Sequence, residues 1–296
     1  MKPVIVISVL SIFITLCSCS RKPVNERSAF DYFGQVHPGD SAEIFAPGII
    51  SDTATRESAL AISPSGKEVF FVRGEWPDTK IMHMVKSGEK WSSPDTAEFS
   101  KDCRATEPAF SPDGRYLYFS TSKGKSDIRD YNLWRTEKTE AGWLTPVSLF
   151  DIGGDSIWEF HPSVAKGGSL YFCYWDVKNS TGDIYFSRCI TDKYSEPVKI
   201  DTPVNTDYSD ADPFVDEEGS YMIFSSNKPG GYGGHDQYIS FNTGDGVWSA
   251  PVNLGLKFNT KEDNYDMDIS PDGNFIFLYM NDDIYWMKKG NLLPSH

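Results

Sequence analysis

The sequence predicts an all-β fold: a five-bladed β-propeller built from four-stranded antiparallel blades. Three observations predict it: a turn motif that recurs five times, a fixed order of strand signals in each repeat, and an incomplete last repeat whose missing strand signal occurs near the start of the chain. Repeats of about 40–50 residues with four strands each are typical of propellers. A six-bladed ring is less favoured, because no remaining segment is long enough for another repeat.

The turn motif is clearest in residues 107–121, which read EPAFSPDGRYLYFST. Ser, Pro, Asp and Gly are the residues that tight turns require, so this stretch predicts a turn between two strands. The intervals between successive turn glycines are 48, 54, 51 and 54 residues, and these glycines are Gly66, Gly114, Gly168, Gly219 and Gly273.

Each repeat carries three further strand signals after its first strand. The second strand is apolar and aromatic, as in residues 117–119 (LYF), and an acid usually precedes the third, as in residues 183–185 (DIY). The fourth combines an aromatic residue with a proline, as in residues 143–146 (WLTP). Proline cannot donate a hydrogen bond to a ladder, so the fourth strand is predicted to be the outer edge of the blade.

The two ends of the series predict how the ring closes. The repeat after Gly273 contains a second and a third strand signal but no fourth. An unassigned aromatic–proline element, residues 43–47 (EIFAP), precedes the first turn. We therefore expect this N-terminal strand to complete the last blade.

The N-terminus predicts an exported, lipid-anchored protein. An apolar run over residues 4–16 is too short to span a bilayer, and its position is typical of a secretory signal. Leu16, Ser18 and Cys19 resemble the lipobox of bacterial lipoproteins, in which the cysteine is acylated; an ordinary cleaved signal is the alternative. The expected organisation is a signal peptide over residues 1–18, a tether over 19–39 and the propeller over 40–296.

Composition limits the partners. The net charge of −14 argues against nucleic acid, so cations, cationic partners or neutral sugars are the expected ligands. The body contains three cysteines, Cys103, Cys173 and Cys189, and the predicted strand register leaves the last two out of alignment for a disulfide. We expect a monomer.

Polar side chains recur at two positions in the predicted first strand, which lines the channel of a propeller. Side chains alternate along a strand, so positions two residues apart share a face. Both rows are therefore expected to point into the channel and to form an acidic ring. The row seven residues before each turn glycine is Ala59, Glu107, His161, Asp212 and Asp266, and the row nine residues before it is Glu57, Ala105, Glu159, Asp210 and Asn264.

The acidic ring predicts a site for a ligand or a cation, because like charges brought together are strained unless a positive group relieves them. The competing interpretation is that these side chains are only solvated. The expected ligand-binding residues are Glu57, Glu107, Glu159, His161, Asp210, Asp212 and Asp266. Ca²⁺ is the ion that the sequence suggests, because two strings offer oxygen ligands: Asp207, Asp210 and Asp212, then Asp263, Asp266 and Asp268. No other cofactor is expected.

A glycoside hydrolase is the alternative function. Its two carboxyl groups would lie about 5–5.5 Å apart for retention or about 6.5–9.5 Å apart for inversion. The candidates are Glu107, Asp212, Asp266 and Glu159. Aromatic side chains that could stack on sugars, or pack between blades, are Trp158, Trp175, Tyr232 and Tyr265.

Residues 107–114 (EPAFSPDG), 227–234 (NKPGGYGG) and 248–255 (WSAPVNLG) resemble the TolB-like, WD40-like propeller repeats of lipoproteins from Bacteroidetes-type bacteria. The resemblance implies a propeller in the bacterial cell envelope, on the outer membrane, with no established catalytic residues. The sequence thus favours a non-enzymatic binding or scaffold module for an envelope protein or a glycan.

Overall fold

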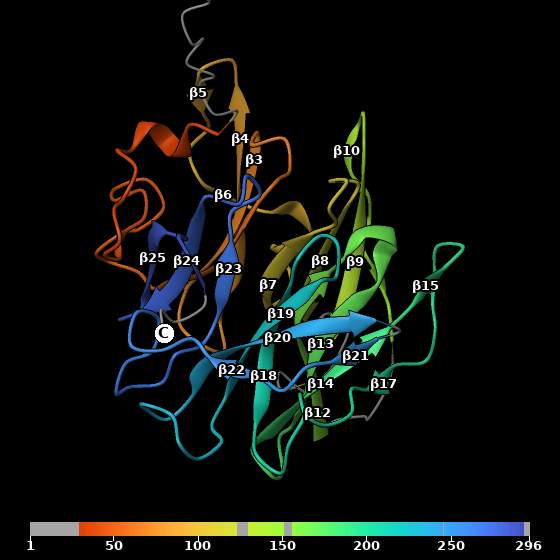
Figure 1. Ribbon diagram of the computed structural model, residues 1–296. Helices are drawn as coiled ribbons and strands as arrows, with labels where there is room; N and C mark the ends of the chain where they lie inside the picture. Colours follow the sequence, from red (N-terminus) through yellow and green to blue (C-terminus); the bar gives the residue numbers. More distant parts are fainter. Residues whose placement is uncertain (1–29, 123–129, 151–155, 245, 293–296) are drawn as a thin grey trace, which may run out of the picture.

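The computed structural model describes residues 30–122, 130–150, 156–244 and 246–292. These residues form five antiparallel blades of four strands arranged as a β-propeller, which confirms the predicted fold class (Figure 1). Within the same residues, no helix has the length and apolar character needed to cross a bilayer.

The first strand of each blade lies innermost and the fourth forms the rim. Blade 1 comprises β2 (Glu57–Ile62), β3 (Glu68–Arg73), β4 (Lys80–Ser87), β5 (Lys90–Trp91) and β6 (Asp95–Thr96). Blade 2 comprises β7 (Ala105–Phe110), β8 (Tyr116–Thr121), β9 (Asn132–Thr139), β10 (Gly142–Trp143) and β11 (Val147–Ser148). Blade 3 comprises β12 (Ile157–Val164), β13 (Leu170–Asp176), β14 (Thr181–Ser187), the hairpin β15 (Cys189–Ile190) and β16 (Lys193–Tyr194), and β17 (Val198–Lys199).

The last two blades follow the same order. Blade 4 comprises β18 (Asp210–Val215), β19 (Tyr221–Ser226), β20 (Asp236–Gly244), β21 (Val247–Trp248) and β22 (Val252–Asn253). Blade 5 comprises β23 (Met267–Ile269), β24 (Phe275–Met280), β25 (Asp283–Lys288) and the N-terminal β1 (Glu43–Ile44). The apolar core lies between neighbouring blades, where Phe70 packs in one cluster with Phe119, and Ile223 in another with Ile276.

In the first four blades, each rim strand consists of two short segments, whereas the sequence suggested one continuous strand. In blade 1, Trp91 pairs with Lys86 and Thr96 pairs with Met82, and Pro94 lies between the two short segments. Because proline lacks the backbone donor, the ladder is interrupted at this position. The rim of each of the first four blades is split in this way.

Closure of the ring joins the two ends of the propeller. In β1, Glu43 pairs with Trp286 and Ile44 with Tyr285 of β25, which confirms the predicted N-terminal strand. Figure 1 shows the orange N-terminal segment beside the blue C-terminal strands. The buried ring of Phe45 lies 5.1 Å from that of Trp286 and 5.0 Å from that of Phe277, so aromatic packing supplements two residues of ladder.

The packed domain begins earlier than residue 40. Tyr32 is buried, with its ring 5.1 Å from that of Phe275 and 5.4 Å from that of Trp286. Asp31 forms an ion pair with Lys86 at 2.6 Å, which links this segment to blade 1. Residues 31 and 32 therefore belong to the closure, although they lie in the range expected to be a tether.

The repeated Ser-Pro-Asp-Gly turn has a local explanation. Ser111 Oγ accepts a hydrogen bond from the backbone of Tyr116 and donates one to Asp113, while Gly114 adopts φ +69°. Ser270 does the same with Phe275 and Asp272. The serine and aspartate satisfy the turn, and the left-handed position requires glycine.

Phe45→Ala should destabilise the protein by about 3–5 kcal/mol, because it leaves a cavity against Trp286 and Phe277 where the ring closes. Urea unfolding monitored by tryptophan fluorescence measures this loss. Val36→Ala is the control, because Val36 is 84% exposed. Equal unfolding midpoints for the two variants would contradict the importance of this contact.

Candidate functional site

A left-handed residue in the first strand of blades 1 to 4, and directly before it in blade 5, determines which side chains reach the centre. The strand register shifts between residues 58 and 60, 106 and 109, 160 and 163, and 211 and 214. The residues at or beside these bulges have positive φ: Ala59 (+44°), Glu107 (+55°), His161 (+50°), Asp212 (+52°) and, in blade 5, Asp266 (+48°). A left-handed residue in a strand breaks the alternation of side chains between faces.

Four of these five side chains meet at the centre of the propeller. His161 Nε2 lies 3.0 Å from Glu107 Oε1, 3.0 Å from Asp212 Oδ1 and 2.9 Å from Asp266 Oδ1. The four residues come from blades 2, 3, 4 and 5, while blade 1 contributes only Ala59. Their side chains are 10–19% exposed. We call this group the central cluster.

The carboxylates of the central cluster differ in their other contacts. Glu107 Oε2 accepts a hydrogen bond from the backbone N–H of His161 at 2.7 Å, and Asp212 Oδ2 accepts one from Ser225 Oγ at 2.6 Å. Asp266 Oδ1 is buried, and no described residue donates a hydrogen bond of good geometry to it. One imidazole N–H can point at only one of the three oxygens around it.

The charges shift the pKa values of this region. Burial opposes the charged form of His161, but the charges of Asp266, Glu107 and Asp212 outweigh it and raise its pKa well above the usual value. Burial raises the pKa of Asp212, although the charge of His161 acts in the other direction. Asp268, two residues after Asp266, has its pKa raised to about 7 by burial and by the charge of Asp266.

A cavity of about 390 Å³ connects the central cluster to the turns between first and second strands. Its walls include prolines of these turns and aromatic residues, among them Pro64, Pro112, Pro271, Phe110 and Phe214. Asp268 lines it as well, and Lys289 is the single lysine or arginine among the described lining residues. The cavity therefore combines an acidic floor with apolar walls.

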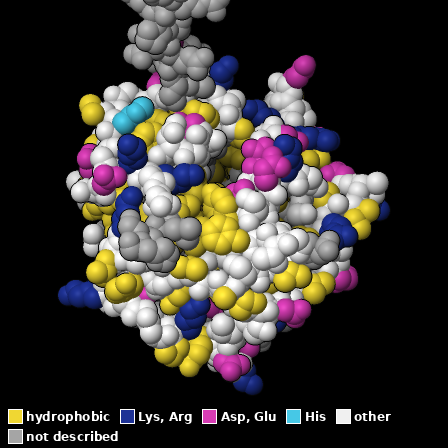
Figure 2. Space-filling view, in the orientation of Figure 1, with side chains coloured by type: hydrophobic (Ala, Val, Ile, Leu, Met, Phe, Trp, Pro, Cys, Tyr) yellow, Lys and Arg dark blue, Asp and Glu magenta, His cyan; other side chains and the backbone are white. Residues whose placement is uncertain are grey.

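The face shown in Figure 2 carries charged side chains of both signs. There, lysine and arginine side chains are scattered among aspartate and glutamate, with hydrophobic side chains between them. The convergence of acids at the central cluster is thus a local feature and not a reflection of the net charge of −14 alone.

The second row of predicted site residues does not share a face with the first, so that expectation is wrong. Glu57, Glu159 and Asp210 are at most 1% exposed, and Asn264 is also buried. The bulge places this row against neighbouring loops and strands: Glu57 binds Arg73 and Thr55, Glu159 accepts from Leu133 N, Asp210 accepts from Thr206, and Asn264 Oδ1 accepts from Thr260.

The two aspartate strings do not form calcium loops. Asp207 is exposed and Asp210 is buried against Thr206, while Asp212 belongs to the central cluster. In the second string, Asp263 binds His235 and only Asp266 reaches the cluster, with Asp268 nearby. Among the described residues, the group with metal-ligand spacing is His161, Asp212 and Asp266.

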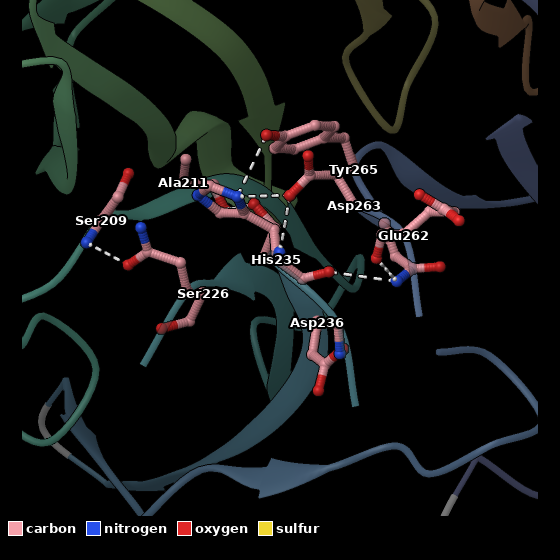
Figure 3. A network of polar contacts seen from close by, with 12 residues as sticks. Ser209, Ala211, Ser226, His235, Asp236, Glu262, Asp263 and Tyr265 are labelled. Atoms are coloured by element: carbon pink, nitrogen blue, oxygen red, sulfur yellow. Dashed lines mark hydrogen bonds and ion pairs between the residues drawn. The ribbon is translucent and has the colours of Figure 1, made fainter. Parts of the chain in front are cut away.

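A second polar network adjoins the central cluster. His235 Nδ1 lies 3.1 Å from Asp263 Oδ1 and 3.0 Å from the Tyr265 hydroxyl (Figure 3). Burial and the charges of Asp263, Asp212 and Asp266 raise the pKa of Tyr265, so the two groups interact electrostatically. The repeat gave no signal for His235, because no other blade carries a histidine directly before its third strand.

The predicted aromatic residues are dispersed. Trp158 packs on Trp76 and Tyr131 at 5.8 and 6.2 Å, which joins three blades, and Trp175 is partly buried. Tyr232 and Tyr265 are 49% and 37% exposed. Trp76, which no repeat motif singles out, is a further exposed aromatic residue, at 51%. The three cysteines in the described part of the chain, Cys103, Cys173 and Cys189, are free thiols.

Comparison with known proteins supports the fold. No family model matches the chain, and no curated protein sequence matches it. TolB from Acinetobacter baumannii is similar in structure, with a TM-score of 0.51 and 13% identity over 82% of this chain and 56% of TolB. The chain thus spans little more than half of TolB.

Two glycoside-hydrolase structures are similar to the same degree. The endo-arabinase from Bacteroides thetaiotaomicron has a TM-score of 0.51 and 15% identity, over 85% of this chain and 95% of the enzyme. The α-L-arabinofuranosidase from Lactobacillus brevis has a TM-score of 0.52 and 11% identity, over 79% of this chain and 90% of the enzyme. At these identities the likeness shows a shared propeller and does not separate a binding protein from an enzyme.

Asp268→Asn should change how stability depends on pH. Native Asp268, with a pKa of about 7, retains a proton that the unfolded chain loses near pH 3.9, so its contribution to stability falls as pH rises from about 4 to about 7. The variant lacks this loss and should gain stability relative to wild type across that interval. Urea unfolding in chelator at several pH values measures the difference. A difference independent of pH would contradict the shifted pKa.

Proposed function

We propose that the chain is a non-enzymatic binding module of the bacterial cell envelope, a monomer anchored through Cys19 to the outer membrane, that engages a protein or glycan partner at its central cavity. The observation that carries the proposal is the cavity itself, about 390 Å³ in volume, with carboxylates at its floor and apolar walls. This volume lies within the range of about 300–1,000 Å³ that is usual for ligand sites.

The charge of the cavity favours a partner with a basic group. Three carboxylates surround one imidazole, so the central cluster stays negative even when His161 is protonated. A lysine or arginine side chain of a partner protein could extend past Phe110 and Phe214 toward Asp266. Its alkyl part would contact the apolar walls while its charge faced the acids. A basic protein segment is therefore the preferred partner, and a glycan is the second.

Glu107→Gln combined with Asp212→Asn tests this proposal. The double variant should fold and should lose the thermal stabilisation that a lysine- or arginine-containing peptide or a glycan gives the wild type, because a ligand bound only by the native state stabilises it by mass action. Glu140→Gln with Asp201→Asn is the matched control, because it removes two acids from exposed positions. Chelator is present throughout. If no peptide or glycan of the panel shifts the wild-type melting temperature, the cavity is only solvated.

A glycoside hydrolase remains the second candidate, and one observation favours it: Asp268 has the raised pKa that a general acid requires. The spacing of the central cluster limits this chemistry. Each contacting carboxylate oxygen lies within 3.0 Å of His161 Nε2, so no two are farther apart than twice that distance. That is shorter than the roughly 6.5 Å needed for inversion, so a pair drawn from Glu107, Asp212 and Asp266 suits retention; this limit does not apply to a pair that includes Asp268. Glu159, buried against Leu133 N, is not available.

A reducing-sugar assay on the same glycan panel separates the two candidates. The binding proposal expects no turnover by the wild type. Turnover that falls by orders of magnitude in either Glu107→Gln or Asp212→Asn alone, while the glycan still binds, would replace the binding module by an enzyme.

The anchor has its own test. Cys19→Ala should release the protein from membranes or block its maturation, because the acylated side chain is removed, whereas Cys17→Ala should leave membrane attachment unchanged. Membrane fractionation and metabolic labelling with a fatty acid measure both effects. Continued acyl labelling of the Cys19→Ala protein would contradict the proposed anchor.

A further inference from the structure

The central cluster has more negative oxygen atoms than its own hydrogen bonds can serve. Three carboxylates approach one imidazole nitrogen, and that nitrogen carries at most one proton. Glu107 and Asp212 each have a donor for their second oxygen, from the His161 backbone and from Ser225. The buried Asp266 Oδ1 lies 2.9 Å from His161 Nε2, and no described residue donates a second contact to it. Since one imidazole proton cannot serve three carboxylate oxygens at once, two of them lack a proton at this nitrogen, and a cation in its place would contact all three.

The spacing of three of these side chains suits a metal ion. His161 Nε2, Asp212 Oδ1 and Asp266 Oδ1 lie within 4.8 Å of one another, with the nitrogen 3.0 and 2.9 Å from the two oxygens. Two ligand atoms bound at right angles, about 2.1 Å from one ion, are about 3.0 Å apart. Glu107 approaches the imidazole from a further blade and can hold a water on the ion.

The chemistry of the ligands selects the class of ion. Ca²⁺ prefers six to eight oxygen ligands at longer distances, whereas imidazole favours first-row transition ions. One imidazole and two carboxylates therefore fit an ion such as Zn²⁺ or Mn²⁺ better than Ca²⁺. Three protein ligands also leave positions open toward the cavity.

We propose that His161, Asp212 and Asp266 bind one divalent transition ion, of the Zn²⁺ or Mn²⁺ class, at the centre of the propeller. The ion replaces the imidazole proton and adds positive charge beside the Asp266 oxygen. It joins blades 3, 4 and 5 through one bond from each. This assignment does not depend on the proposed function, because the ion needs no partner or substrate to bind.

The test measures metal content and stability of the full-length protein with no partner present. After chelation and dialysis, the protein is incubated with Zn²⁺, Mn²⁺ or Ca²⁺, passed over a desalting column and assayed by elemental analysis. One Zn²⁺ or Mn²⁺ per chain is expected. At a metal concentration about one hundred times the Kd, the melting temperature should rise by roughly 5 °C or more, since a native-state ligand stabilises by mass action.

His161→Gln and Asp266→Asn should each lose the bound ion and the thermal shift. Asp263→Asn is the matched control, because it removes an acid next to the cluster that binds His235 and not the ion. Circular dichroism shows whether each variant is folded. If a variant does not fold, the number of metal ions bound per wild-type chain still tests the proposal. Any of three results would overturn the proposal: the wild type binds no metal, Asp266→Asn binds as much metal as the wild type, or only Ca²⁺ binds.

Discussion

A left-handed residue at one position of every blade is the constraint on which the centre of this propeller depends. At Glu107, His161 and Asp212 it lies in the first strand, where the register with the second strand shifts. Without it, these side chains would alternate regularly with the row two residues earlier, and both rows would compete for the same narrow space. The bulge points the two rows in different directions. The row at the left-handed position converges on the propeller axis, and the row two residues earlier binds the neighbouring loops and strands.

This division explains how so many acids are tolerated near one another. Glu57 forms an ion pair with Arg73, and Asp210 accepts hydrogen bonds from Thr206 that also hold the chain entering blade 4, although burial still raises the pKa of Asp210. In the converging row, three carboxylates share the charge of His161. The central cluster is thus the place where acids from several blades converge, and its charge also acts on Asp268 and Tyr265 beside it.

The propeller ring, its closure and its turns could be predicted from the sequence. Each depends on residue types that recur at a regular interval: glycine at a left-handed position, proline at a sheet edge and aromatic residues in buried strands. The sequence also identified the converging row. It failed on the second row because alternation was assumed to continue through the bulge. A signal was present: Pro108, Pro162 and Pro213 each follow the left-handed residue, and proline in an inner strand indicates a bulge. The separations of the carboxylates have no such signal, because they depend on packing between blades.

Because β1 pairs with β25, the ring can close only after the last strand of the chain is available. Glu43 and Trp286 are separated by nearly the whole propeller, so their contact has the greatest loop-closure entropy of any ladder in the fold. Chains dominated by such distant pairings fold slowly. A protein exported with its N-terminus first would hold β1 and the ring of Phe45 unpaired until its last strand had crossed the membrane. During that interval the unpaired edge of β25 and the unpaired β1 can pair with each other across two chains. This would favour domain swapping between neighbouring chains unless both edges were covered.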